Sequence, residues 1–274
     1  MRFPYKLLSD ILQLKPGAMV EVKGHKIYLK TSDKASISFF LTGKYEEFET
    51  ELLEREIREG MTFLDIGAYI GYYTVVASKV AGKEGKVFAF EPDLHNFRLL
   101  ERNVETNACQ NVVLVQKAVS DKSGKINLFL CNDSEGDRRA ASRIYDSGNG
   151  RKHILVDAIA LDDFFKEEDL EVHFIKMDIE GAEPLALKGM ISLLARSKKV
   201  RMITEFYPEG LRLLGFSPEE YLRDLLECGF EIYHMNDQKK KLEPVNLQMP
   251  RRIYCVSLFC KKGSRERQVG TYAH

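Results

Sequence analysis

The feature that most constrains the fold of this chain is an alternation of short apolar runs with helical stretches. Helical stretches are predicted at Tyr72–Val80, about 93–107, Pro184–Ala195 and Pro218–Cys228. Seven apolar runs have the length and composition of strands, namely Met61–Ile66, Lys86–Glu91, Asn111–Val119, Val172–Asp178, Val200–Phe206, Phe230–Met235 and Arg252–Cys260. Apolar runs of this kind are typical of parallel strands that are buried on both faces. The pattern therefore predicts an α/β fold, a doubly wound, seven-stranded, mostly parallel sheet covered by helices.

Two regions lie outside this alternation. Residues 1–59 contain a predicted hairpin and a charged helix at Tyr45–Glu59, which together resemble a lid. The segment Cys131–Lys152 is polar and too long for an ordinary connection, and such loops are usually functional or mobile. We therefore expect an N-terminal cap at 1–59, a core domain at 60–262 with an insertion at 131–152, and a tail at 263–274.

Composition excludes several classes of protein. The 274 residues carry 41 Lys and Arg against 41 Asp and Glu, so the formal net charge is zero and nucleic acid is not the expected partner. The five cysteines form no CxxC pair, which predicts reduced thiols. No run of about 18 apolar residues predicts a membrane span, and the N-terminal apolar run is too short and interrupted for a signal peptide. We expect a soluble, cytoplasmic protein.

The turn after the first strand indicates the ligand. Residues 65–71 read DIGAYIG, and Ala68 and Tyr69 stand where a dinucleotide fingerprint needs its second glycine. Asp65 would repel a phosphate but would suit a cationic or amino-bearing ligand. Glu91, at the end of the next strand, is placed to accept both hydroxyls of a ribose. A ribose with a positively charged, phosphate-free tail describes S-adenosylmethionine (SAM).

The chain also resembles a known family over most of its length, from about residue 45 to about 260. Six segments carry this resemblance, namely FLDIGAYIGYYT (63–74), EPDLHNFRLLERN (91–103), KAVSDKSG (117–124), LDDF (161–164), IKMDIEGAE (175–183) and ITEFYPE (203–209). They are similar to successive motifs of FkbM-type methyltransferases, which are SAM-dependent enzymes with the seven-stranded, Rossmann-like class I fold. The family usually carries Asn where this chain has Tyr69, a change that should be tolerated because the turn binds mainly through its backbone.

The resemblance implies a cofactor site that agrees with the residue chemistry. Its expected members are Asp65, Gly67, Ala68, Tyr69 and Gly71 around the methionine end, Thr74 in the first helix, Glu91 and Pro92 at the ribose, Ala118 and Val119 at the adenine, and Asp178, which could meet the cofactor's ammonium or the substrate. Thr74 could equally be a packing residue.

O-methylation of a small molecule, sugar or lipid-like metabolite is the activity that the resemblance implies. A hydroxyl nucleophile would need a base. The candidates are Asp178, Glu180 and Glu205, because repulsion between neighbouring carboxylates raises the pKa of one of them. Glu180 could instead act with Glu183 at the start of the next helix. Three carboxylates could also hold Mg²⁺, although we predict no metal.

Three alternatives remain open at the level of sequence. An RNA or protein methyltransferase would use aromatic residues near the site, such as Tyr69 and Tyr207, as stacking platforms. A protein that binds SAM without catalysis would keep the cofactor motifs only. A nicotinamide-dependent reductase is disfavoured by the missing second glycine. In the insertion, Arg138, Arg139, Ser142 and Arg143 could contact an acidic or polyhydroxylated substrate, or could belong to a solvated loop.

Overall fold

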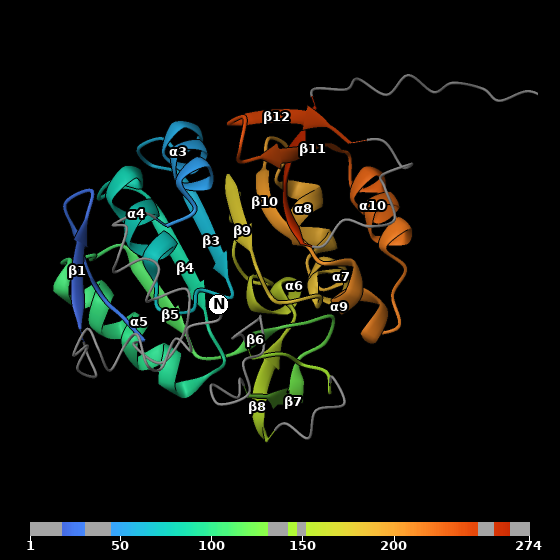
Figure 1. Cartoon of the computed structure of the whole chain (residues 1–274), viewed down its shortest axis with the longest axis horizontal. Coiled ribbons are helices and arrows are strands. Elements are labelled where there is room, and N and C mark those ends of the chain that lie inside the picture. The colour runs from blue at the N-terminus through green and yellow to red at the C-terminus, as the bar shows by residue number, and fades with distance from the viewer. Residues whose placement is uncertain (1–17, 31–44, 131–141, 147–151, 246–254, 264–274) are drawn as a thin grey trace, which may run out of the picture.

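The computed structural model describes residues 18–30, 45–130, 142–146, 152–245 and 255–263. Its centre is an eight-stranded sheet (Figure 1). The strands lie in the order β12 (Lys241–Pro244), β11 (Phe230–Asn236), β13 (Val256–Lys262), β10 (Arg201–Phe206), β9 (Phe174–Met177), β3 (Thr62–Ile66), β4 (Lys86–Phe90) and β5 (Val112–Val115). The strands from β10 to β5 are parallel, whereas β13 is antiparallel to both of its neighbours.

The sheet confirms the predicted fold class and corrects its details. The eighth strand, β12, was not predicted because it is short and largely polar, as edge strands often are. The predicted strand at Asn111–Val119 is in fact two strands, since β5 ends at Val115 and β6 covers Ala118–Val119 in a different sheet. The polar pair Gln116 and Lys117 marks the break between them.

Helices cover both faces of the sheet (Figure 1). One face packs against α3 (Glu47–Glu56), α4 (Tyr72–Ala81) and α5 (Leu94–Thr106). The other packs against α6 (Leu161–Phe164), α7 (Glu183–Lys188), α8 (Ile191–Arg196), α9 (Pro208–Leu213) and α10 (Pro218–Glu227). Along β3, Phe63 belongs to the first core and Leu64 to the second, as expected when successive side chains point to opposite faces.

The single helix predicted at Pro184–Ala195 is two helices. α7 ends before Gly189, whose Cα lies so close to the Ser120 carbonyl that a side chain would collide with it. A new helix then starts because the Asp162 carboxylate accepts hydrogen bonds from the Ser192 and Leu193 N–H groups at 2.9 and 2.7 Å. Such bonds satisfy donors that the first turn of a helix leaves unpaired.

A second sheet flanks the polar insertion. In it, β8 (His153–Ile159) pairs parallel with β6 and antiparallel with β7 (Gly124–Phe129). This sheet lies at the lower edge of Figure 1. It was not predicted, and the insertion is consequently a connection between two of its strands.

The N-terminal hairpin and helix are both present. β1 (Met19–Val22) pairs antiparallel with β2 (His25–Tyr28), and α3 is shorter than the predicted Tyr45–Glu59. The Tyr28 N–H donates to Asn103 Oδ1 of α5 at 2.7 Å, which ties the hairpin to the core. The hairpin and α3 share one apolar core with α4 and α5. The proposed domain boundary at 59/60 stays a prediction.

Other predicted segments are only partly visible. Most of the insertion at 131–152 and all but the first residue of the tail at 263–274 lie outside the described residues. No helix in the described part of the chain is both long enough and apolar enough to cross a membrane.

Candidate functional site

A cavity of about 310 Å³ opens where the strand order reverses, between β3 and β9. In open α/β sheets, ligands bind at this point beyond the carboxyl ends of the strands. The cavity is bordered by the ends of these strands, by β6 and by the residues before α3. Its walls contain nine of the eleven predicted cofactor residues, namely Asp65, Gly67, Ala68, Tyr69, Glu91, Pro92, Ala118, Val119 and Asp178.

The glycine turn connects β3 directly to α4. The N–H groups of Gly67 and Ala68 both donate to the Phe90 carbonyl of β4 at 3.0 Å, so the turn folds back across the sheet edge. Gly67 has φ 83°, and a Cβ there would collide with the Asp178 carbonyl. Tyr69 also has a positive φ of 51°, a region that Asn enters more readily than Tyr. This conformation gives a physical reason for the Asn that FkbM-type proteins usually carry here.

A substitution at Gly67 should therefore be costly. We expect Gly67→Ala to destabilise the fold by about 2–4 kcal/mol, through positive φ and the collision with Asp178, and to weaken cofactor binding. Gly215→Ala is the matched control, because Gly215 has φ 82° but nothing within 4 Å of an added Cβ. Urea unfolding of both variants checks this, and equal losses at the two positions would contradict the steric part of the argument.

Asp65 is the next-to-last residue of β3, and its carboxylate is almost fully enclosed. The Thr74 hydroxyl donates to Asp65 Oδ2 at 2.5 Å, so Thr74 orients Asp65 from α4 and does not line the cavity itself. Burial raises the pKa of Asp65 to about 6. Gly71 likewise lies behind the turn, against Leu100, at the start of α4.

Glu91 follows β4 and is 5% exposed. Its Oε2 accepts from the Tyr69 N–H and its Oε1 from the Asp93 N–H, each at 2.9 Å. These bonds hold the carboxylate against the cavity wall. Burial raises the pKa of Glu91 to about 8. A buried carboxylate facing an open cavity is chemically suited to accept the hydroxyl hydrogens of a ribose.

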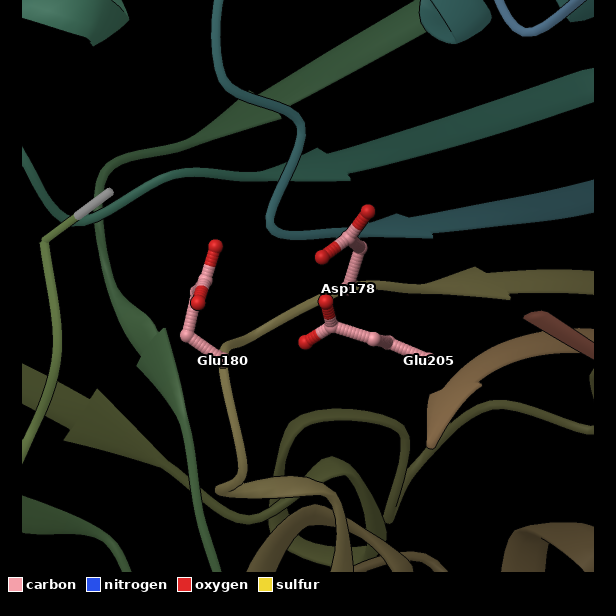
Figure 2. A group of neighbouring side chains, drawn as sticks. All are labelled: Asp178, Glu180 and Glu205. Atoms are coloured by element: carbon pink, nitrogen blue, oxygen red, sulfur yellow. The ribbon is translucent and has the colours of Figure 1, made fainter. Parts of the chain in front are cut away.

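The predicted catalytic carboxylates converge at the other side of the cavity. Asp178 follows β9, Glu180 lies in the loop after it, and Glu205 lies on β10 (Figure 2). One oxygen from each lies within 4.8 Å of the others. Burial, followed by the nearby charges of Asp178 and Glu180, raises the pKa of Glu205 well above its ordinary value. Glu205 Oε1 accepts from Cys255 Sγ at 2.7 Å, while its buried Oε2 has no hydrogen-bond partner in the described part of the chain.

Sequence reasoning missed Lys176, which precedes these carboxylates on β9. It lies in the apolar run FIKM, is only 2% exposed and lines the cavity. Its Nζ lies 3.1 Å from Asp178 Oδ2 and 3.5 Å from Glu49 Oε2 of α3. It also lies 5.3 Å from the centre of the Tyr73 ring. A buried lysine is retained only with partners of this kind, so Lys176 ties the N-terminal helix to the sheet edge.

The insertion contributes only in part. Ser142 lines the cavity, and its hydroxyl donates to Asp93 Oδ2 at 3.4 Å. Arg143 is buried and lies 5.8 Å from the centre of the Tyr145 ring. The predicted contacts of Arg138 and Arg139 lie outside the described residues.

Glu183 fixes the loop that carries Asp178 and Glu180. It is fully buried at the start of α7, and its Oε1 accepts from the Ile179 N–H at 3.0 Å. Burial raises the pKa of Glu183 from about 4.5 to about 8. Between these pH values the native state keeps a proton that the unfolded chain has released.

This raised pKa predicts a pH dependence of stability. The contribution of Glu183 is fully present below about pH 4.5 and is lost as pH rises through 8, at about 1.4 kcal/mol per pH unit. We expect Glu183→Gln to flatten the fall in unfolding free energy between pH 5.5 and 7.5 by about 1 kcal/mol per unit. Urea unfolding at several pH values measures this, and an unchanged slope would show that Glu183 is not protonated in the native state.

Comparison with known proteins agrees with the cavity. A family model described as the methyltransferase FkbM domain matches residues 65–232. The matched region contains the glycine turn, Glu91 and the three converging carboxylates.

Two curated relatives share one description, "Probable cobalt-precorrin-6B C(15)-methyltransferase (decarboxylating)". The protein from Sulfurisphaera tokodaii is 30% identical over 118 residues, which cover 40% of this chain and 60% of that protein. The protein from Saccharolobus solfataricus is 27% identical over 145 residues, which cover 51% of this chain and 73% of that protein. The chain thus spans less than two thirds of the first of these relatives.

Solved structures of low identity also align with the chain. A SAM-dependent methyltransferase from Aquifex aeolicus gives a TM-score of 0.45 with 19% identity, over 78% of this chain and 89% of that one. A SAM-dependent O-methyltransferase from Thermotoga maritima gives a TM-score of 0.44 with 15% identity, over 95% of this chain and 83% of that one.

Proposed function

Because the chain belongs to the FkbM methyltransferase family, whose cofactor is SAM, we propose that it methylates a hydroxyl group of a small molecule, sugar or lipid-like metabolite. The observation that carries this proposal is the convergence of Asp178, Glu180 and Glu205 at the edge of the cavity. Carboxylates accept hydrogen bonds from hydroxyl groups and repel phosphates. The arrangement favours a neutral, hydroxylated acceptor over a nucleic-acid backbone.

The fit of the cofactor rests on the cavity walls. Asp65, Gly67, Ala68 and Tyr69 would hold the methionine end, in a turn too tight for a side chain at Gly67. Glu91 and Pro92 would hold the ribose. Ala118 and Val119 of β6 would border the adenine. In this proposal Gly71 and Thr74 act indirectly, Gly71 by starting α4 and Thr74 by orienting Asp65.

SAM supplies a methyl group activated by its sulfonium, so the chain must mainly position the acceptor and remove a proton. A C–O bond forms as the C–S bond breaks, the C–S electron pair stays on sulfur, and the hydroxyl proton passes to a carboxylate. Glu205 is the proposed base because its raised pKa suits it to accept that proton. Asp178 and Glu180 would accept hydrogen bonds from the acceptor.

An acceptor panel tests the proposal. The purified protein is incubated with SAM carrying a ¹³C methyl group and with sugars, polyols, glycolipids, RNA and protein substrates. A new methyl ether carbon in the NMR spectrum of a hydroxylated acceptor supports O-methylation. Label found only in RNA, in protein side chains or on carbon would contradict it, and binding of SAM without any transfer would indicate a non-catalytic protein.

Chelation tests the role of metal ions in the same assay. Lys176 already places a positive charge 3.1 Å from Asp178. We therefore expect methyl transfer to keep more than half of its rate in excess EDTA. A loss in EDTA that Mg²⁺ restores would instead indicate that the three carboxylates bind a hard cation.

A further inference from the structure

One end of the cavity is strongly acidic. One of its carboxylates comes from the N-terminal segment, the residues before β3. Glu46, the residue directly before α3, lines the cavity together with Tyr73, Asp65 and Asp178. The Tyr73 hydroxyl donates to Glu46 Oε2 at 2.8 Å. Glu46 keeps solvent-accessible surface, so its carboxylate can be reached by a ligand.

Among the described residues, the charges at this end of the cavity do not balance. In the part of the chain that the structure describes, four carboxylates, from Glu46, Glu49, Asp65 and Asp178, surround one cation, Lys176. Lys176 is already shared between Glu49 and Asp178. Unmatched negative charge in an enclosed site is costly unless a carboxylate takes up a proton or a cation binds.

The order of the strands shows which part of the cofactor reaches this end. The proposed ribose ligand, Glu91, follows β4, and the proposed adenine wall is formed by Ala118 and Val119 of β6, which comes after β5 in the chain. The amino-acid end, which is proposed to lie at the glycine turn after β3, would then extend away from the ribose towards β9. Glu46, Tyr73 and Lys176 meet there.

We infer that Glu46 binds the α-ammonium group of SAM, with Tyr73 positioning its carboxylate. This inference rests on the proposed placement of the ribose at Glu91, but not on the identity of the acceptor. It assigns a cofactor-binding role to the N-terminal segment, outside the region 65–232 that the family model matches. That segment would thus supply part of the cofactor site.

Two nucleosides separate this role from a structural one. S-adenosylhomocysteine carries the ammonium group, whereas 5′-methylthioadenosine has the same adenosine and sulfur but no amino-acid end. Both are titrated by calorimetry into the wild type, Glu46→Gln and Glu91→Gln. Glu51→Gln serves as the control, because Glu51 is an exposed glutamate on α3 that pairs with Lys240 at 2.9 Å.

We expect Glu46→Gln to weaken S-adenosylhomocysteine binding by about tenfold to a hundredfold, as for the loss of a charged hydrogen bond, and to leave 5′-methylthioadenosine within about twofold. Glu91→Gln should weaken both nucleosides, and Glu51→Gln neither. Retained binding of 5′-methylthioadenosine shows that the Glu46 variant is folded. Equal losses for both nucleosides, or no loss for S-adenosylhomocysteine, would overturn the inference. If Glu91→Gln weakens the binding of neither nucleoside, the result would instead contradict the proposed placement of the ribose at Glu91.

Proton release gives a second readout. Partial burial of the carboxylate, followed by the charge of Glu49, raises the pKa of Glu46 above its ordinary value despite Lys176, and Tyr73, Asp65 and Asp178 also face this group. Binding of an ammonium group should therefore displace protons from the fraction of Glu46 that is protonated. Calorimetry in buffers of different ionisation enthalpy should show more release with S-adenosylhomocysteine than with 5′-methylthioadenosine, a difference that Glu46→Gln removes. Persistence of the difference in that variant would contradict the assignment.

Discussion

Glu91→Ala should weaken SAM binding by about 100-fold to 1,000-fold. The substitution removes both oxygens that are proposed to accept the ribose hydroxyl hydrogens, and a loss of about 1.5–2 kcal/mol for each hydrogen bond corresponds to this change in affinity. The loss should appear as a change in Kd in calorimetric titration of the wild type and the variant. Saturating SAM should then restore part of the turnover, because the acceptor side of the cavity is unchanged.

The same carboxylate also holds the glycine turn, through the Tyr69 and Asp93 N–H groups. Stability must therefore be measured beside affinity. Glu105→Ala is the matched control, because Glu105 is an exposed glutamate on α5, the helix that follows Glu91. A Glu91 variant that unfolds normally but binds SAM as the wild type does would remove Glu91 from the ribose site.

The strand ends that form this site could be predicted from sequence. Asp65, Glu91 and Asp178 each lie near, or directly after, the carboxyl end of a buried parallel strand, and such strands bring these ends to one edge of the sheet. Local pattern was sufficient there because burial on both faces leaves a continuous apolar run. The strands β7, β8 and β12 were missed for the opposite reason, since they are half exposed or polar.

The acidic end of the cavity depends on packing that local pattern does not show. Lys176 interrupts an apolar strand, and only the fold reveals that Glu49, 127 positions earlier in the sequence, pairs with it. The sequence does contain a partial indication that Glu49 is buried. Glu49 precedes Leu52 and Leu53 by three and four residues, which places it on the apolar stripe of its helix. A charged residue on a buried helical face predicts a buried partner.

Glu205→Gln should lower kcat by about 100-fold to 1,000-fold and leave SAM affinity unchanged. The change removes the proposed base, and general-base catalysis contributes about 10²–10⁴-fold. Affinity is retained because Glu205 lies on β10, beyond the strands proposed to hold the cofactor. Glu209→Gln, an exposed residue in the following helix, is the control.

The pH profile separates a base from a group that merely binds the acceptor. The pKa of Glu205 is raised well above its ordinary value by burial and by Asp178, Glu180 and Glu183, which favours its protonated form in the empty site. Only the ionised form accepts a proton, so kcat of the wild type should rise with pH.

In Glu205→Gln the remaining activity should lose this rise, whereas Glu205→Asp should keep it at a lower kcat. A Gln variant that keeps more than a tenth of wild-type kcat with the same pH dependence would contradict the role of Glu205. The proton would then pass to Asp178 or Glu180. Asp178 Oδ2 is already paired with Lys176 Nζ at 3.1 Å, whereas Glu205 Oε2 has no hydrogen-bond partner in the described part of the chain. The lysine that sequence reasoning missed thus favours Glu205 over Asp178 as the proton acceptor.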